Sequence, residues 1–135
     1  MTSDKTVVFT ESAPAPAHLF SQGIRKGGLF QVSGQGSVDP DTMQYVGVGD
    51  VGAQTRRTLE NVKAILLAGG ATVEDVLMFR VYMSTREDFG EMNAAYSEFI
   101  RANVPSGQLP CRTTVVVDLP NEDMLVEIDA LAVIS

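Results

Sequence analysis

The sequence predicts one α+β domain, a mixed β-sheet with two helices on one face. Its 135 residues are about the size of one ordinary domain, so we expect a single domain over residues 1–135. Short β-rich segments alternate with only two segments of helical periodicity. The resulting order, β-β-β-α-β-α-β-β, favours one layer of sheet under one layer of helix.

Three strands are expected before the first helix. Thr6–Thr10 is short and β-rich, which is typical of an edge strand. Phe20–Arg25 and Leu29–Gly34 predict the next two strands. Lys26–Gly28 predicts the turn between them, because glycine adopts positive φ at little cost.

Two helices follow from spacing and capping residues. The first begins after Asp50, a favourable N-cap residue, and ends at Gly69–Gly70. The second begins at Thr85, with Asp88 as the acid of a capping box. The apolar face of this second helix consists of Phe89, Met92, Tyr96, Phe99 and Ile100.

Three more strands complete the predicted sheet. Val76–Met83 lies between the helices, and Arg112–Leu119 and Leu125–Ile134 follow as a hairpin joined by residues 120–123. Val76–Met83 and Arg112–Leu119 carry apolar side chains on both faces, yet two helices cover only one face. We therefore expect a homo-oligomer in which the sheet packs against its copies.

Composition narrows the classes of function. Ten Lys and Arg against seventeen Asp and Glu give a net charge of -7, and an acidic surface repels phosphates, so we predict no nucleic-acid partner. No apolar run approaches the ~20 residues that span a bilayer, and the start lacks the apolar stretch of a signal peptide. We expect a cytoplasmic protein with no membrane partner. One Cys and one His rule out a disulfide framework and disfavour a zinc site.

Three polar residues stand where the pattern favours apolar ones. Asn93 lies near the apolar face of the second helix and either caps a strand end or loop, or makes a ligand or loop-positioning contact. Arg112 opens a strand and is a surface residue, a structural ion-pair partner or a clamp for a carboxylate. Glu127 is an exposed carboxylate paired with a cation, or part of a site with Arg112.

The expected geometry of that site follows from strand alternation. A four-residue turn would bring Arg112 and Thr114 to the side of the sheet that holds Glu127. Arg112 and Glu127 would still lie several residues apart along the hairpin, so a site that uses both needs another element or another subunit. We expect His18 at the surface and Cys111 as a small core residue.

Six segments, in order, match those of one known family: Phe20–Gly23, Val32–Gln35, Asn61–Ile65, Asp88–Tyr96, Arg112–Pro120 and Val126–Ile128. From about residue 6 to its end, the chain resembles the RidA (YjgF) family of reactive-intermediate deaminases. The resemblance implies a chorismate-mutase-like (RidA-like) fold and a homotrimer with sites between subunits. It also implies hydrolysis of enamines and imines, such as 2-aminoacrylate and 2-iminopropanoate, to 2-oxo acids and ammonia. An imine carbon is already electrophilic, so no metal or organic cofactor is expected.

The resemblance also implies roles for individual residues. Arg112 matches the arginine that clamps the substrate carboxylate, and Glu127 matches the glutamate of water activation or proton transfer. The pocket positions that match are Ser33, Gly34 and Asn93. Phe20 stands where the best-studied branch has a Tyr, and Thr114 stands where it has a Cys. The Thr114 hydroxyl would hold the water or the developing charge, and these two departures bear on substrate range.

Three other functions stay open from the sequence. The first is a regulatory module whose Arg112 cleft binds a 2-oxo acid or similar carboxylate without turnover. The second is a specialised deaminase of a larger enamine acid, with Phe20 setting the size of the pocket. The third is the ribonuclease activity attributed to some relatives, against which the charge of -7 and the lack of a His pair argue.

Overall fold

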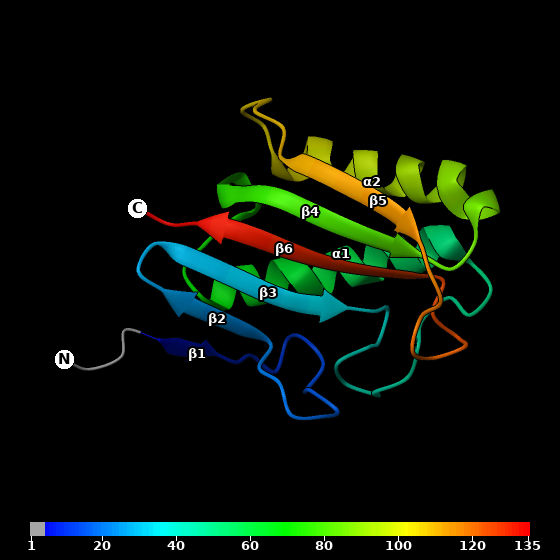
Figure 1. Cartoon of the computed structure of the whole chain (residues 1–135), viewed down its shortest axis with the longest axis horizontal. Helices are drawn as coiled ribbons and strands as arrows, with labels where there is room; N and C mark the ends of the chain where they lie inside the picture. The colour runs from blue at the N-terminus through cyan, green and yellow to red at the C-terminus, as the bar shows by residue number, and fades with distance from the viewer. Residues whose placement is uncertain (1–4) are drawn as a thin grey trace.

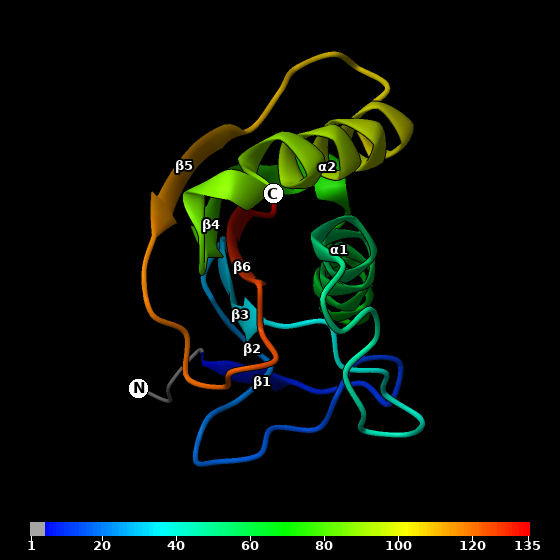
Figure 2. The same cartoon turned by 90° about the vertical axis from the view of Figure 1, so that its right-hand side faces the viewer.

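The computed structural model describes residues 5–135 and contains one six-stranded sheet with two α-helices on one face (Figures 1 and 2). The strands are β1 (Thr6–Val8), β2 (Gly23–Lys26), β3 (Leu29–Gln35), β4 (Val76–Met83), β5 (Cys111–Val116) and β6 (Val126–Val133). The helices are α1 (Val51–Ala68) and α2 (Phe89–Asn103), with 3₁₀ turns η1 (Val73–Asp75) and η2 (Arg86–Asp88). The predicted α+β class and helix placement are confirmed. Within residues 5–135, no helix is long and apolar enough to cross a membrane.

The predicted hairpin between the last two strands is wrong. Across the sheet the strands run β1-β2-β3-β6-β4-β5, so β4 separates β5 from β6. β5 pairs with β4 in parallel, whereas all other neighbours are antiparallel. A parallel pair requires a crossover, and α2 provides it by returning the chain to the starting end of β4. The segment that follows β5 then passes β4 and enters the sheet beside β3 (Figure 1).

The ends of α1 confirm the sequence prediction. The Asp50 side chain accepts a hydrogen bond from the Ala53 N–H at 3.0 Å, and Gly69 closes the helix by donating to Ile65 and Leu66. Gly70 follows with φ 86°, a conformation that favours glycine.

The predicted start of the second helix is wrong by one turn. Thr85 accepts from the Glu87 N–H and caps η2, while α2 begins at Phe89 without a side-chain cap from Asp88. Phe89 is 43% exposed and does not belong to the buried face of α2. That face consists of Met92, Ala95, Tyr96, Phe99 and Ile100.

The first two strands are shorter than predicted because only part of each segment pairs with a neighbouring strand. Pairing of β1 with β2 begins at Val8 and Gly23, so Phe20 precedes the strand instead of opening it. The buried Gln22 side chain ties this segment to the N-terminal arm, accepting from the Thr10 N–H at 2.7 Å and donating to the Pro14 carbonyl at 2.9 Å. These bonds hold residues 10–22 as a folded arm at the end of the sheet.

The core lies between the helices and one face of the sheet. Its largest fully buried side chains include Phe30, Leu59, Ile65, Phe79 and Ile128. The opposite face, here called the open face, is covered by neither helix in Figure 2. It exposes apolar side chains along several strands, namely Val7, Leu29, Val115 and Val133. Cys111 is exposed at this face as well, so the prediction of a core cysteine is wrong.

Candidate functional site

Three of the predicted site residues line one cavity of about 450 Å³, namely Phe20, Gly34 and Glu127. The cavity lies where the N-terminal arm, the end of β3 and the segment before β6 meet. Its other walls are mostly apolar and include Pro14, Pro16, Val38, Tyr45 and Met124. His18 is exposed, as predicted, but it also lines this cavity.

Glu127 lines this cavity, and its carboxyl has a perturbed pKa. Burial raises the pKa of its carboxyl above the ordinary value, and the negative charge of Asp129 raises it further. A carboxyl whose pKa moves toward neutrality exchanges protons more readily under physiological conditions. Glu127 can therefore accept a proton from water and return it to a leaving group.

Gly34 makes room for that carboxylate. A methyl group built on Gly34 would overlap the Glu127 carboxylate, with its carbon 3.0 Å from Cδ and 3.3 Å from Cγ. Any side chain at this position of β3 would push Glu127 away. The role of Gly34 at the cavity is thus to let a neighbouring strand place its acid close to the backbone.

Ser33 does not line the cavity. Its hydroxyl donates to the Ser21 carbonyl at 2.6 Å, and its N–H donates to the Gln22 carbonyl at 2.8 Å. These two bonds join β3 to the arm that carries Phe20. Ser33 therefore shapes the cavity by fixing its walls.

Arg112 is held on the helix side of the sheet, at the edge strand β5. Its Nη1 donates to the Asn93 Oδ1 at 2.8 Å, and its guanidinium carbon lies 4.6 Å from the centre of the Tyr96 ring and 5.9 Å from that of Phe89. Asn93 thus positions the arginine instead of capping a strand. Hydrogen bonding and cation–π contact restrict the guanidinium. The arginine lines a second cavity of about 250 Å³ beside Tyr96 and Leu109.

Thr114 lies two residues beyond Arg112, on the same face of β5. Its hydroxyl oxygen is buried and has no hydrogen-bond partner among the described residues. A buried hydroxyl without a partner costs free energy, which makes such groups rare and informative. Thr114 and Arg112 together present one partnerless hydroxyl and one positioned cation at the edge of the sheet.

The structure does not bring Arg112 and Glu127 together, so the prediction that they share a face is wrong. Arg112 is paired with Phe79, whose side chain is in the core, whereas Glu127 is paired with Tyr82 on the open face. The intervening strand β4 fixes this difference, because residues paired across neighbouring strands point to the same side. Within one chain the two groups lie on opposite faces of the sheet.

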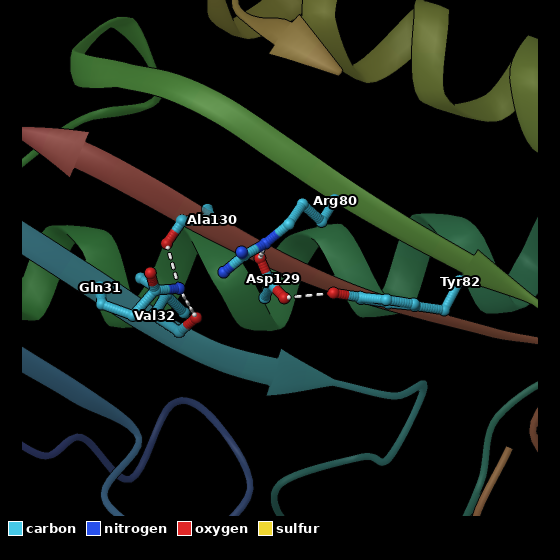
Figure 3. Close-up of polar contacts among 6 residues, drawn as sticks. All are labelled: Gln31, Val32, Arg80, Tyr82, Asp129 and Ala130. Atoms are coloured by element: carbon cyan, nitrogen blue, oxygen red, sulfur yellow. Dashed lines mark hydrogen bonds and ion pairs between the residues drawn. The ribbon is translucent and has the colours of Figure 1, made fainter. Parts of the chain in front are cut away.

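A polar cluster on the open face surrounds Asp129 (Figure 3). The Arg80 Nε donates to Asp129 Oδ1 at 2.8 Å, and the Tyr82 hydroxyl donates to Asp129 Oδ2 at 3.1 Å. Beside it, the Gln31 side chain donates to the carbonyls of Val32 and Ala130. The cluster partly neutralises Asp129 next to Glu127. Sequence reasoning missed Arg80, although a cation inside an apolar strand was a visible signal.

Sequence reasoning also missed two buried amides on α1. Gln54 donates to the Asp123 carbonyl at 2.9 Å and accepts from the Leu125 N–H at 2.9 Å, which fixes the segment leading into β6. Asn61 donates to the carbonyls of Gly36 and Val38, which fixes the loop after β3. Both amides are fully buried on the apolar stripe of the helix. Their helical spacing among apolar residues was the signal that would have found them.

The sequence matches the family described as "Endoribonuclease L-PSP" over residues 10–134. The chain belongs to this family. It is 41% identical over 128 residues to a RutC family protein of Pyrococcus abyssi, and the aligned residues cover 95% of this chain and 96% of that protein. It is 39% identical over 129 residues to the 2-iminobutanoate/2-iminopropanoate deaminase of Salmonella typhimurium, and this alignment covers 96% of this chain and 97% of that protein.

Solved structures of the family share the fold. E. coli TdcF with bound serine matches with a TM-score of 0.89 and 35% identity, covering 96% of this chain and 99% of that one. The YjgF gene product of E. coli matches with a TM-score of 0.87 and 37% identity, covering 95% and 98%. The resemblance to the RidA/YjgF family and its fold is thereby confirmed.

Proposed function

We propose that this chain is a hydrolytic deaminase of small 2-imino acids and their enamine tautomers, such as 2-iminopropanoate and 2-aminoacrylate. The observation that carries the proposal is the half-buried Glu127, whose pKa is raised by burial and by Asp129 at the wall of an apolar cavity. Relatives at 37% and 39% identity that are named 2-iminobutanoate/2-iminopropanoate deaminases support it.

Glu127 would carry the proton transfers of this reaction. The water oxygen bonds to the imine carbon, the water gives a proton to Glu127, and the π electrons of the C=N bond move to nitrogen, which takes up a proton from solvent. Glu127 then returns its proton to the amine of the resulting carbinolamine. The C–N bond breaks, ammonia leaves, and the hydroxyl loses its proton to solvent as the C=O bond forms. Acid–base help of this kind gives about 10²–10⁴-fold.

Arg112 would bind the substrate carboxylate through two parallel charge-assisted hydrogen bonds. Because Arg112 and Glu127 face opposite sides of the sheet, we propose that each site combines Arg112 and Thr114 of one subunit with Glu127 of another. The exposed apolar side chains of the open face, including Leu29 and Val115, support assembly through this sheet. A homotrimer is the proposed state, with a site at each subunit interface.

A coupled assay tests the activity. A serine or threonine dehydratase generates 2-aminoacrylate in situ, and pyruvate release is followed with and without the protein. Arg112→Ala removes the clamp, and Arg56→Ala, an exposed arginine on α1, is the matched control. We expect acceleration by the wild type and by Arg56→Ala, and none by Arg112→Ala. A correctly folded wild-type oligomer that gives no acceleration would reject the small aminoacrylates as substrates.

A mixing experiment tests the shared site. Arg112→Ala and Glu127→Gln chains are unfolded together in equal amounts and refolded, beside each variant refolded alone. If each site takes Arg112 from one subunit and Glu127 from its neighbour, random assembly restores both groups in about one quarter of the sites. If both groups acted within one subunit, the mixture would stay as inactive as the separate variants.

A second candidate is a binding module without turnover. The bound serine in the structure of E. coli TdcF favours it, because serine has a carboxylate and an amine but no C=N bond. Binding of a 2-oxo acid by calorimetry, with no acceleration in the coupled assay, would establish this alternative. The same preparations incubated with RNA at low salt test the remaining ribonuclease hypothesis, for which we expect no cleavage.

A further inference from the structure

The loop between β3 and α1 presents an aromatic ring to the cavity on a rigid support. Val38 and Tyr45 form an antiparallel bridge across the loop. Next to it, Ser37 and Val46 are joined twice, through the Ser37 hydroxyl and through the Val46 N–H, both at 2.9 Å. The buried Asn61 of α1 donates to the Val38 carbonyl at 2.9 Å. The backbone that carries Tyr45 is therefore fastened to a buried helix.

The Tyr45 ring packs at the wall that also contains Glu127. A methyl group built on Gly36 would lie 3.5 Å from Cε1 of Tyr45, so the ring lies close to the backbone of Gly36. Both Tyr45 and Glu127 line the cavity of about 450 Å³. The phenol and the carboxylate are thus presented to the same space from two different elements.

The Tyr45 hydroxyl is free to act on a ligand. Among the described residues, no side chain or backbone group forms a hydrogen bond with it. It is also the only hydroxyl among the described side chains that line the cavity, since Phe20 has none. The amide nitrogen of Gln22 is already committed to backbone carbonyls of the arm, including that of Pro14.

The protonation state of the Tyr45 phenol suits a hydrogen-bond donor. Burial raises the pKa of Tyr45, and the negative charges of Asp123 and Glu127 raise it further. The hydroxyl therefore keeps its proton throughout the neutral range. The influence of Glu127 on Tyr45 also agrees with their shared position at the cavity wall. A protonated phenol beside a carboxylate offers one donor and one acceptor, which suits a water molecule held between them.

We propose that Tyr45 is a further catalytic residue, whose hydroxyl donates a hydrogen bond to the oxygen that attacks the imine carbon while Glu127 accepts a proton from that oxygen. The inference rests on the proposed function. The new C–O bond forms as the C=N π electrons move to nitrogen, and Tyr45 neither gains nor loses a proton. It holds the water in line for attack and afterwards keeps the hydrogen bond to the carbinolamine oxygen.

Tyr45→Phe tests the role, because it removes the hydroxyl and keeps the ring. We expect kcat for 2-iminopropanoate to fall about 100-fold, the size of losing one donor to a reacting oxygen, while KM changes less than about threefold. Gln44→Ala is the control: it truncates an exposed side chain that lies on the same loop as Tyr45 and does not line the cavity. We expect its kcat to stay within about threefold of the wild type.

A second readout does not depend on turnover. With tyrosine labelled by ¹³C at the ring Cζ, the three tyrosines give three NMR signals that single Tyr→Phe variants assign. Addition of 2-oxobutanoate, a stable 2-oxo acid, should shift the Tyr45 signal.

The outcomes separate this inference from the function on which it rests. Wild-type turnover together with a fully active Tyr45→Phe variant, or with a Tyr45 signal that does not respond to the ligand, would overturn the role of Tyr45 alone. Absence of wild-type turnover would overturn the proposed function and the inference with it. A fall in kcat for Tyr45→Phe with an active Gln44→Ala control would support both.

Discussion

Replacing Gly34 by alanine should disable the site without unfolding the protein. The added methyl would overlap the Glu127 carboxylate and lie 3.0 Å from Cδ and 3.3 Å from Cγ, where ordinary contact begins at 3.4 Å. The φ angle of Gly34 lies outside the left-handed region, so alanine is not strained there. The conflict therefore falls on the side chain of Glu127. Side-chain rotation of a half-buried group relieves it at a cost of about 1 kcal/mol.

The loss of activity follows from that displacement. To clear the methyl group, the carboxylate oxygen must move by about 1 Å, and a misplacement of that size in an active site costs about 100-fold in rate. We expect the coupled assay to show kcat/KM reduced by about that factor, with a melting temperature within about 5 °C of the wild type. Gly90→Ala is the matched control, because a methyl group there meets nothing within 4 Å. A fully active Gly34→Ala variant would refute the placement of Glu127 in the reaction.

Three further changes test separate parts of the structure. Because the folded pKa of Glu127 is raised, the stability linked to its protonated form is fully present below the unfolded pKa and is lost as pH rises through the folded pKa. Glu127→Gln should therefore raise the melting temperature at pH 8 and leave it nearly unchanged at pH 3.5, as calorimetry would show, whereas the same gain at both pH values would contradict the raised pKa. Gln54→Ala leaves the Leu125 N–H and the Asp123 carbonyl without partners, and urea unfolding should show a loss of about 3 kcal/mol. Thr114→Val removes a hydroxyl that has no partner among the described residues. The free energy of unfolding should therefore not fall, whereas deaminase activity should. A lower free energy of unfolding would contradict this account.

Local features of the fold were predictable because the physics that determines them is local. The Asp50 cap, the Gly69–Gly70 stop and the bounds of Val76–Met83 match the structure, since each depends on a few neighbouring residues. The Lys26–Gly28 turn was predictable for the same reason, with Gly27 at φ 57°. The start of α2 was missed by one turn because Thr85 caps a 3₁₀ turn as readily as an α-helix.

Strand order was not predictable, and for this reason the predicted placement of Arg112 on the same face as Glu127 was wrong. The pattern of residues 111–116 states that a strand forms but not which strand it joins. Its parallel pairing with β4 depends on how α2 packs across the sheet, which is a long-range property. That pairing puts Arg112 on the helix side and Cys111 on the open face, the reverse of the expected arrangement. The residue types of the candidate site followed from the sequence, but the face of the sheet on which each side chain lies did not.

The two halves of the proposed site are each built before any subunit meets another. Arg112 is oriented by Asn93 and Tyr96, and Glu127 is seated against the backbone of Gly34. Neither arrangement depends on contacts outside the chain. Assembly would therefore bring two ordered halves together with little reorganisation, and the ordering of each half is already achieved when the chain folds. In the proposed assembly, the open face carries the acid, and the cation is carried by the edge strand, which a neighbouring subunit would reach.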